Sequence, residues 1–166
     1  MADIESLNRL IRRWYVRAKP GTFTVDDPFD NFVCLWLAFN AWGSYVTGIE
    51  NNDSDMKNRL KTDPRLVDSF KKDRQDPEFN KKLLQMKGAK IPTHRTTHEY
   101  VCMNDEESFG EVLEVIYRIR CNLFHGRKDP EEEQEQKYVK WATFVLDHVF
   151  HGIMDGSDFL ARNGTQ

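Results

Sequence analysis

The segment from Asp27 to Trp42 constrains the fold more than any other part of the chain. Asp27 precedes Pro28, the arrangement of an N-cap residue followed by proline at the first helical position. The residues after it are apolar on nearly every side of a helix: Phe29, Phe32, Val33, Leu35, Trp36, Leu37, Phe39 and Trp42. A helix that is apolar all round must be covered on all sides, so we expect this one at the centre of the core.

Three further long helices are predicted around that centre. An apolar stripe over residues 4–14 predicts an amphipathic first helix. Asn104 and Glu107 have the spacing of a capping pair for a helix over about 105–124. A proline and a run of acids predict a last helix over about 130–153, because acids are favoured at a helix N-terminus.

The region between the second and third long helices is basic and divided by prolines. Pro64 and Pro77 split it into short helical pieces that end near Gly88. Residues 91–103 are rich in strand-preferring side chains and predict a loop or a short extended piece. The whole pattern predicts an all-α fold, an antiparallel helical bundle with a basic insertion of short helices.

Length and composition fit one ordinary globular domain. The chain has 166 residues, of which 39% are hydrophobic and 31% charged. We place the domain at residues 1–156 and a flexible tail at 157–166. No apolar run is long enough to span a membrane, and acids stand near the N-terminus, so we expect a cytoplasmic protein. Free thiols are the expected state of the cysteines, Cys34, Cys102 and Cys121.

The candidate chemistry lies near the end of the third long helix. Helical periodicity places Arg120 on the apolar face of that helix, where a guanidinium needs a carboxylate, a subunit boundary or an anionic ligand. His125 follows five residues later beside Gly126, and Asn122 lies between them. An arginine, an imidazole and an amide are suited to phosphodiester cleavage. A salt-bridged arginine and a histidine that caps the helix are the structural alternatives.

The segment from Arg120 to His125 resembles the R-x4-6-H motif of HEPN domains (higher eukaryotes and prokaryotes nucleotide-binding). The aromatic run before it, residues 35–42, and the long helix after Pro130 are similar to prokaryotic HEPN proteins, so the likeness covers about 27–153. It implies an all-α homodimer with two motif copies in one cleft and a metal-independent endoribonuclease that needs no cofactor. Arg120 would hold the scissile phosphate, His125 would act as general acid or base, and Asn122 would position them.

The resemblance also bears on partners and on the rival function. It implies a defence or toxin-like role, with an antitoxin or nucleotidyltransferase-type partner. Some toxin members carry a tyrosine two residues after the histidine that such a partner adenylylates. This chain has Arg127 there, so we do not expect that route of regulation. The alternative is a non-catalytic HEPN-like module that binds a nucleotide, RNA or a protein.

RNA is the expected partner of the basic side chains. Residues 55–95 hold twelve Lys and Arg against six Asp and Glu, in a chain whose net charge is −3. Seven cations are the candidate phosphate contacts: Lys71, Lys72, Arg74, Lys81, Lys82, Arg127 and Lys128. The alternative is a set of solvated helix faces.

Two weaker features complete the candidates. His94, His98 and Cys102 are spaced four residues apart, but the segment is threonine-rich and no fourth ligand is evident, so we predict loop histidines and no metal site. Asn40 lies on a buried side of the central helix. We expect it to make a core hydrogen bond, with a supporting contact to the Arg120 cleft as the alternative.

Overall fold

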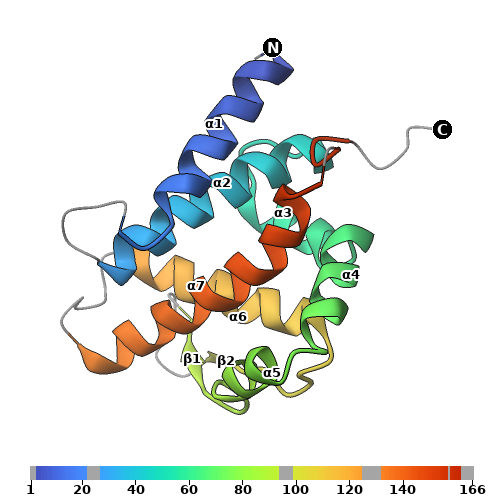
Figure 1. The fold of residues 1–166 in the computed structure, drawn as a ribbon. Coiled ribbons are helices and arrows are strands. Elements are labelled where there is room, and N and C mark those ends of the chain that lie inside the picture. The colour runs from blue at the N-terminus through green and yellow to red at the C-terminus, as the bar shows by residue number, and fades with distance from the viewer. Residues whose placement is uncertain (1–2, 22–26, 94–98, 125–131, 157, 162–166) are drawn as a thin grey trace.

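The computed structural model describes residues 3–21, 27–93, 99–124, 132–156 and 158–161 (Figure 1). Over these residues the chain is mostly helical, with one small two-stranded sheet, which confirms the predicted all-α class. The long helices are α1 (Ile4–Arg17), α2 (Pro28–Thr47), α6 (Phe109–Phe124) and α7 (Glu133–Met154). Three short helices lie between α2 and α6, as the prolines predicted: α3 (Asp53–Leu60), α4 (Pro64–Asp73) and α5 (Pro77–Leu84).

Helix α2 forms the centre of the core, as predicted. The Asp27 side chain caps it by accepting the Phe29 amide at 2.8 Å, and Gly48 ends it with a φ of 69°, a conformation that favours glycine. Its largest side chains, Trp36, Phe39 and Trp42, are at most 1% exposed. Helix α1 packs along α2, and α7 packs against it as well.

The short helices begin where capping residues meet prolines. Asp63 and Asp76 each accept a backbone amide at the start of α4 and α5, while Pro64 and Pro77 occupy the first helical positions. Asn52 caps α3 in the same way without a proline. The segment after α5 forms two short antiparallel strands, β1 (Ile91–Pro92) and β2 (Tyr100–Val101). The extended alternative for this segment is therefore correct.

Two helices begin later than predicted. Ser108 accepts the Glu111 amide at 3.3 Å just before α6, so Ser108 rather than Asn104 provides the cap. The Glu111 carboxylate instead accepts the Asn104 and Asp105 amides at 2.7 and 3.0 Å. Helix α7 begins after Glu132, whose backbone is still extended.

The predicted domain boundary at residue 156 is too early. Phe159 is 4% exposed, and its carbonyl accepts the Trp42 indole N–H at 2.6 Å. Arg65 donates to the Ala161 carbonyl at 2.5 Å. The packed chain therefore reaches Ala161, because an aromatic side chain within the predicted tail finds a place in the core. Residues 162–166 lie outside the described residues.

None of the described helices combines the length and the apolar character that a membrane-spanning segment needs.

Candidate functional site

Arg120 lies near the end of α6 and forms an ion pair with α3. Its Nη2 is 2.6 Å from Oδ2 of Asp53, and the two side chains are 19% and 27% exposed. Asp53 is the first residue of α3, which packs on α6. The positive charge on the apolar face of α6 is thus paired with a carboxylate of the same chain. A carboxylate was one of the three partners expected from the sequence, beside a subunit boundary and an anionic ligand.

Aromatic rings surround the guanidinium on several sides. Its carbon lies 4.7 Å from the ring centre of Phe124, 5.6 Å from that of Trp36 and 6.0 Å from that of Tyr117. Such contacts attract a cation without using its N–H groups. Burial raises the pKa of Tyr117 to about 12, so its phenol stays protonated at neutral pH. The rings therefore hold Arg120 in place and leave its hydrogen bonds free for oxygen acceptors.

A hydrogen-bond chain connects Asp53 to the central helix. Asn40 donates its amide to Oδ1 of Asp53 at 3.2 Å, and Ser44 donates its hydroxyl to Oδ1 of Asn40 at 3.1 Å. Asn40 therefore supports the Arg120 site through Asp53, which was the alternative role considered for it. Sequence reasoning missed Asp53, since residues 48–55 look only like a polar turn and the start of a helix.

The buried Nε of Arg120 is not satisfied by the ion pair with Asp53. This Nε is shielded from solvent and has no hydrogen-bond partner among the residues that the structure describes. Buried donors of this kind are uncommon and often mark a site that is completed by a ligand or water. The ion pair with Asp53 therefore satisfies the guanidinium only in part.

A cleft of about 730 Å³ lies beside this network. Asp53 and Asn40 form part of its wall, and α1 and the end of α2 form the rest through Ile4, Leu7, Ser44 and Tyr45. The cleft gives solvent and small ligands access to the carboxylate that holds Arg120.

Asn122 lies away from Arg120. Two positions along a helix are about 200° apart around its axis, so the two side chains leave α6 on nearly opposite sides. The Asn122 amide is 6% exposed and donates to the Pro92 carbonyl at 3.0 Å. In this structure it fastens β1 to α6 and does not contact the guanidinium.

His125, Arg127 and Lys128 lie outside the described residues. Phe124, the last residue of α6, is 45% exposed and covers one side of Arg120. The convergence of Arg120 with His125 stays a prediction.

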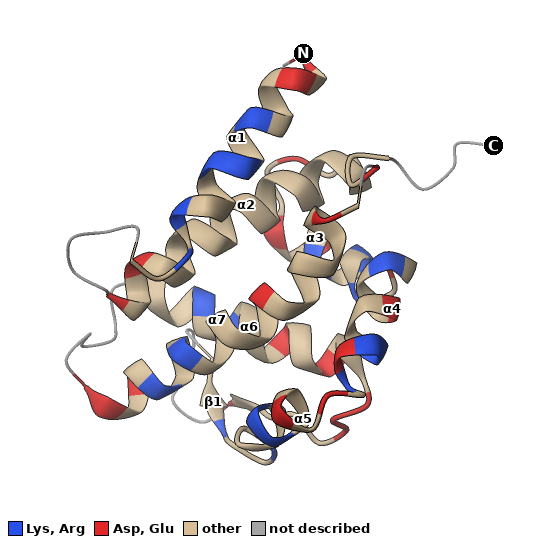
Figure 2. Ribbon diagram, in the orientation of Figure 1, with Lys and Arg blue, Asp and Glu red and all other residues tan. Residues whose placement is uncertain are grey.

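The predicted RNA-contacting cations differ in their exposure and in their contacts within the chain, and the basic positions are spread over several helices (Figure 2). Lys71, Lys72 and Lys81 are exposed, and Lys82 is half-buried. Arg74 is committed within the chain, since it donates to the Glu106 carbonyl at 2.6 Å. Lys72 and Lys82 line separate hollows that α7 borders, whereas Asp53 lines the cleft between α1 and α2.

Another basic surface was missed in the sequence. Helix α1 carries four exposed arginines, Arg9, Arg12, Arg13 and Arg17. Figure 2 shows several basic positions along this helix. The alternation of these arginines with apolar residues was visible in the sequence and could have identified the surface.

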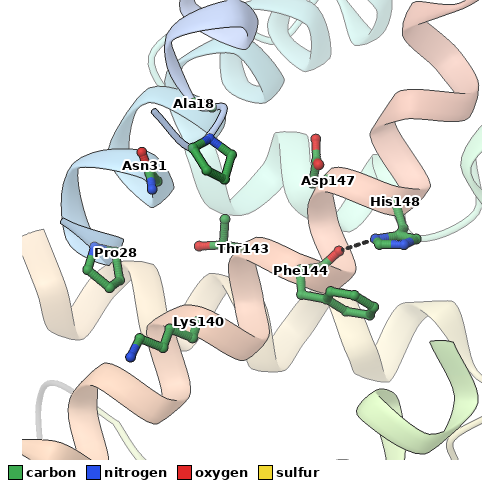
Figure 3. Close-up of a pocket in the computed structure, with 9 residues that line it drawn as sticks. Ala18, Pro28, Asn31, Lys140, Thr143, Phe144, Asp147 and His148 are labelled. Atoms are coloured by element: carbon green, nitrogen blue, oxygen red, sulfur yellow. Dashed lines mark hydrogen bonds between the residues drawn. The ribbon is translucent and has the colours of Figure 1, made fainter. Parts of the chain in front are cut away.

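A further hollow of about 400 Å³ lies between the end of α1, the start of α2 and the middle of α7 (Figure 3). Three of its polar side chains are engaged within the chain, whereas the buried Oδ1 of Asn31 has no hydrogen-bond partner among the described residues. Thr143 donates to the Val139 carbonyl at 2.8 Å, and Nδ1–H of His148 donates to the Phe144 carbonyl at 2.8 Å. Lys19 pairs with Asp147 at 2.5 Å. The hollow therefore presents mainly apolar surface.

No metal site is found within the described part of the chain, where no three His, Cys, Asp or Glu side chains gather in a way that could hold an ion. Cys102 follows β2 as a free thiol, while His94 and His98 lie outside the described residues.

Comparisons with protein-family models, with curated proteins and with solved structures found no match for this chain. The geometry around Arg120 and the motif in the sequence therefore have to support the functional proposal.

Proposed function

We propose that this chain is a metal-independent endoribonuclease of the HEPN type, defence or toxin-like, that acts in the cytoplasm. The observation that supports the proposal most is the state of Arg120. A guanidinium is held among three aromatic rings, five residues before a histidine, and its buried Nε–H has no acceptor among the described residues. Such a group is suited to bind a phosphodiester.

The chemistry follows from the residue types. The ribose 2′-hydroxyl attacks the adjacent phosphorus, the bond from phosphorus to the 5′-oxygen breaks, and a 2′,3′-cyclic phosphate and a 5′-hydroxyl form. His125 moves a proton at one of these oxygens, and Arg120 stabilises negative charge on the non-bridging oxygens. Asn122 contributes indirectly, because it anchors β1 against the helix that carries Arg120.

The proposed active form is a homodimer through the face that carries Arg120. Phe124, beside Arg120, is a large aromatic side chain that is 45% exposed in the single chain, and an interface would cover it. We predict that light scattering at micromolar concentration gives twice the 19.6 kDa of one chain. A mass of 19.6 kDa under those conditions would rule out a composite site.

RNA binding is expected to involve the exposed lysines of α4 and α5. Replacing Lys71, Lys72, Lys81 and Lys82 by glutamine should weaken binding to RNA of any sequence and flatten its salt dependence, because each lost phosphate contact reduces counterion release. Fluorescence anisotropy at several salt concentrations measures both effects. Unchanged affinity and slope would return these lysines to the role of solvated surface. Replacing the α1 arginines, Arg9, Arg12, Arg13 and Arg17, by glutamine tests whether that helix contributes more to RNA affinity than the lysines of α4 and α5 do.

A second candidate function is a non-catalytic module that binds a nucleotide, RNA or a protein. The ion pair with Asp53 favours it, because Arg120 is already neutralised within the chain. Incubation of the purified protein with mixed RNA separates the two candidates. Cleavage supports the ribonuclease, whereas binding without cleavage, together with harmless expression in a host, supports the module.

A further inference from the structure

We infer that Asp53 is a built-in competitor for the anion that Arg120 binds. Arg120 would alternate between Asp53, as in this structure, and a phosphodiester of RNA, and Asp53 would thereby set how tightly the site takes its substrate. The inference rests on the proposed function for the identity of the anion.

When Arg120 is paired with Asp53, the hydrogen-bonding capacity of its guanidinium is only partly used. The guanidinium uses Nη2 to contact Asp53 at 2.6 Å, while Nε is buried without a partner among the described residues. A buried donor that has lost water and gained no acceptor raises the free energy of that state. A movement of the guanidinium that gives Nε an acceptor removes this penalty.

A phosphodiester can offer Arg120 two free oxygens, whereas Asp53 contacts it through Oδ2 alone while its Oδ1 accepts the Asn40 amide. The two non-bridging oxygens of the phosphodiester can accept two parallel N–H bonds from a guanidinium fork. The three rings lie 4.7 to 6.0 Å from the guanidinium carbon of Arg120 and take up none of its N–H groups. The cation can therefore exchange acceptors while it stays among the same rings.

Asp53 can release Arg120 because other groups stabilise its charge. It is the first residue of α3, where the helix dipole favours a carboxylate, and it accepts the Asn40 amide at 3.2 Å. It also borders an open cleft of about 730 Å³, which admits water. The carboxylate is thus not left buried and alone when the ion pair opens.

The test measures binding separately from cleavage. The probe is a short RNA whose 2′-hydroxyls are all methylated, which can bind but cannot form a cyclic product. Asp53→Asn removes the competing charge at nearly constant size, and we expect it to bind this probe about tenfold more tightly than the wild type does. The double variant Asp53→Asn/Arg120→Ala should lose the gain.

Glu50→Gln is the matched control. Glu50 is exposed and lines the same cleft, so this change removes one negative charge without touching the ion pair. We expect less than about twofold tighter binding from it, because exposed charges are screened. Equal affinities of Asp53→Asn and Glu50→Gln for the methylated RNA would overturn the inference. The inference is also overturned if neither variant binds this RNA measurably.

A measurement on the wild type covers the case in which Asp53→Asn does not fold. The NMR signal of the Arg120 Nε–H should move downfield when the methylated RNA is added, because that donor gains an acceptor. An unchanged signal at saturation overturns the competition. If Asp53→Asn binds the methylated RNA more tightly but the wild type leaves unmodified RNA intact, only the proposed cleavage is refuted. If the wild type cleaves RNA but Asp53→Asn binds the methylated RNA no more tightly than the wild type does, only the inference about Asp53 is refuted.

Discussion

His125→Ala is expected to lower the rate of RNA cleavage by about 10²–10⁴-fold, because a positioned general acid or base contributes about that factor. Arg120→Ala should cost about 10²–10³-fold through lost stabilisation of charge on the phosphoryl oxygens. Single-turnover cleavage of a labelled RNA measures both effects. Circular dichroism and light scattering should show the same helical fold and dimer as for the wild type.

Structural features explain why Arg120→Ala should leave the fold intact. Asp53 keeps its Asn40 contact and its partial exposure, so no isolated buried charge remains. Arg59→Ala is a suitable control, because Arg59 is an exposed arginine on the same short helix as Asp53. Normal cleavage by His125→Ala would refute the assigned chemistry. Unfolding of Arg120→Ala, together with an inactive wild type, would make Arg120 a structural ion-pair residue.

The largest effect on stability is expected at Glu114. This carboxylate of α6 accepts Lys57, whose side chain is only 4% exposed, and also Lys61 at 2.7 Å and Arg118 at 3.2 Å. Glu114→Gln leaves the buried Lys57 ammonium without a counter-charge, which typically costs about 3–5 kcal/mol. Chemical denaturation measures the loss. Glu107→Gln should change stability by less than about 1 kcal/mol, because Glu107 is 81% exposed and 3.7 Å from Arg74.

The Glu114 carboxylate also makes the free energy of unfolding depend on pH. Burial alone would raise the pKa of Glu114, but hydrogen bonds from Lys57 and Lys61 outweigh it and hold the pKa below its ordinary value. The stabilisation is therefore complete above the pKa of the unfolded chain, about 4.3, and is lost as the pH falls through the lower pKa of the folded protein. This part of the acid dependence should be missing in Glu114→Gln. An identical acid profile in both proteins would contradict the assignment.

The features that sequence reasoning predicted well are local. The start of α2 follows from Asp27, Pro28 and the apolar run after them, and so does the burial of most of its large side chains. Val33 and Leu37 are only half-buried, so the helix is not covered on all sides. Pro64 and Pro77 likewise mark the starts of α4 and α5. The start of α6 was missed because two capping patterns overlap, and the Ser108 pattern is the one that forms. In each case the outcome depends on residues within one helical turn.

The candidate site depends on contacts between distant segments, and these could not be predicted. Asp53 meets Arg120 across 67 positions of sequence, and only the packing of α3 on α6 brings them together. Periodicity could have separated Asn122 from Arg120, since their side chains leave the helix about 200° apart. The tail was misjudged for a similar reason, because the place of Phe159 depends on Trp42 in α2.

The end groups of the RNA fragments show whether the 2′-hydroxyl is the nucleophile, as the proposed metal-independent reaction requires. The purified wild-type protein is incubated with RNA in the presence of EDTA, and the fragments are examined by mass spectrometry. We expect cleavage in EDTA, with 2′,3′-cyclic phosphate and 5′-hydroxyl ends. Intact RNA, fragments with 3′-hydroxyl ends, or cleavage that stops with EDTA and returns with a divalent ion would contradict it.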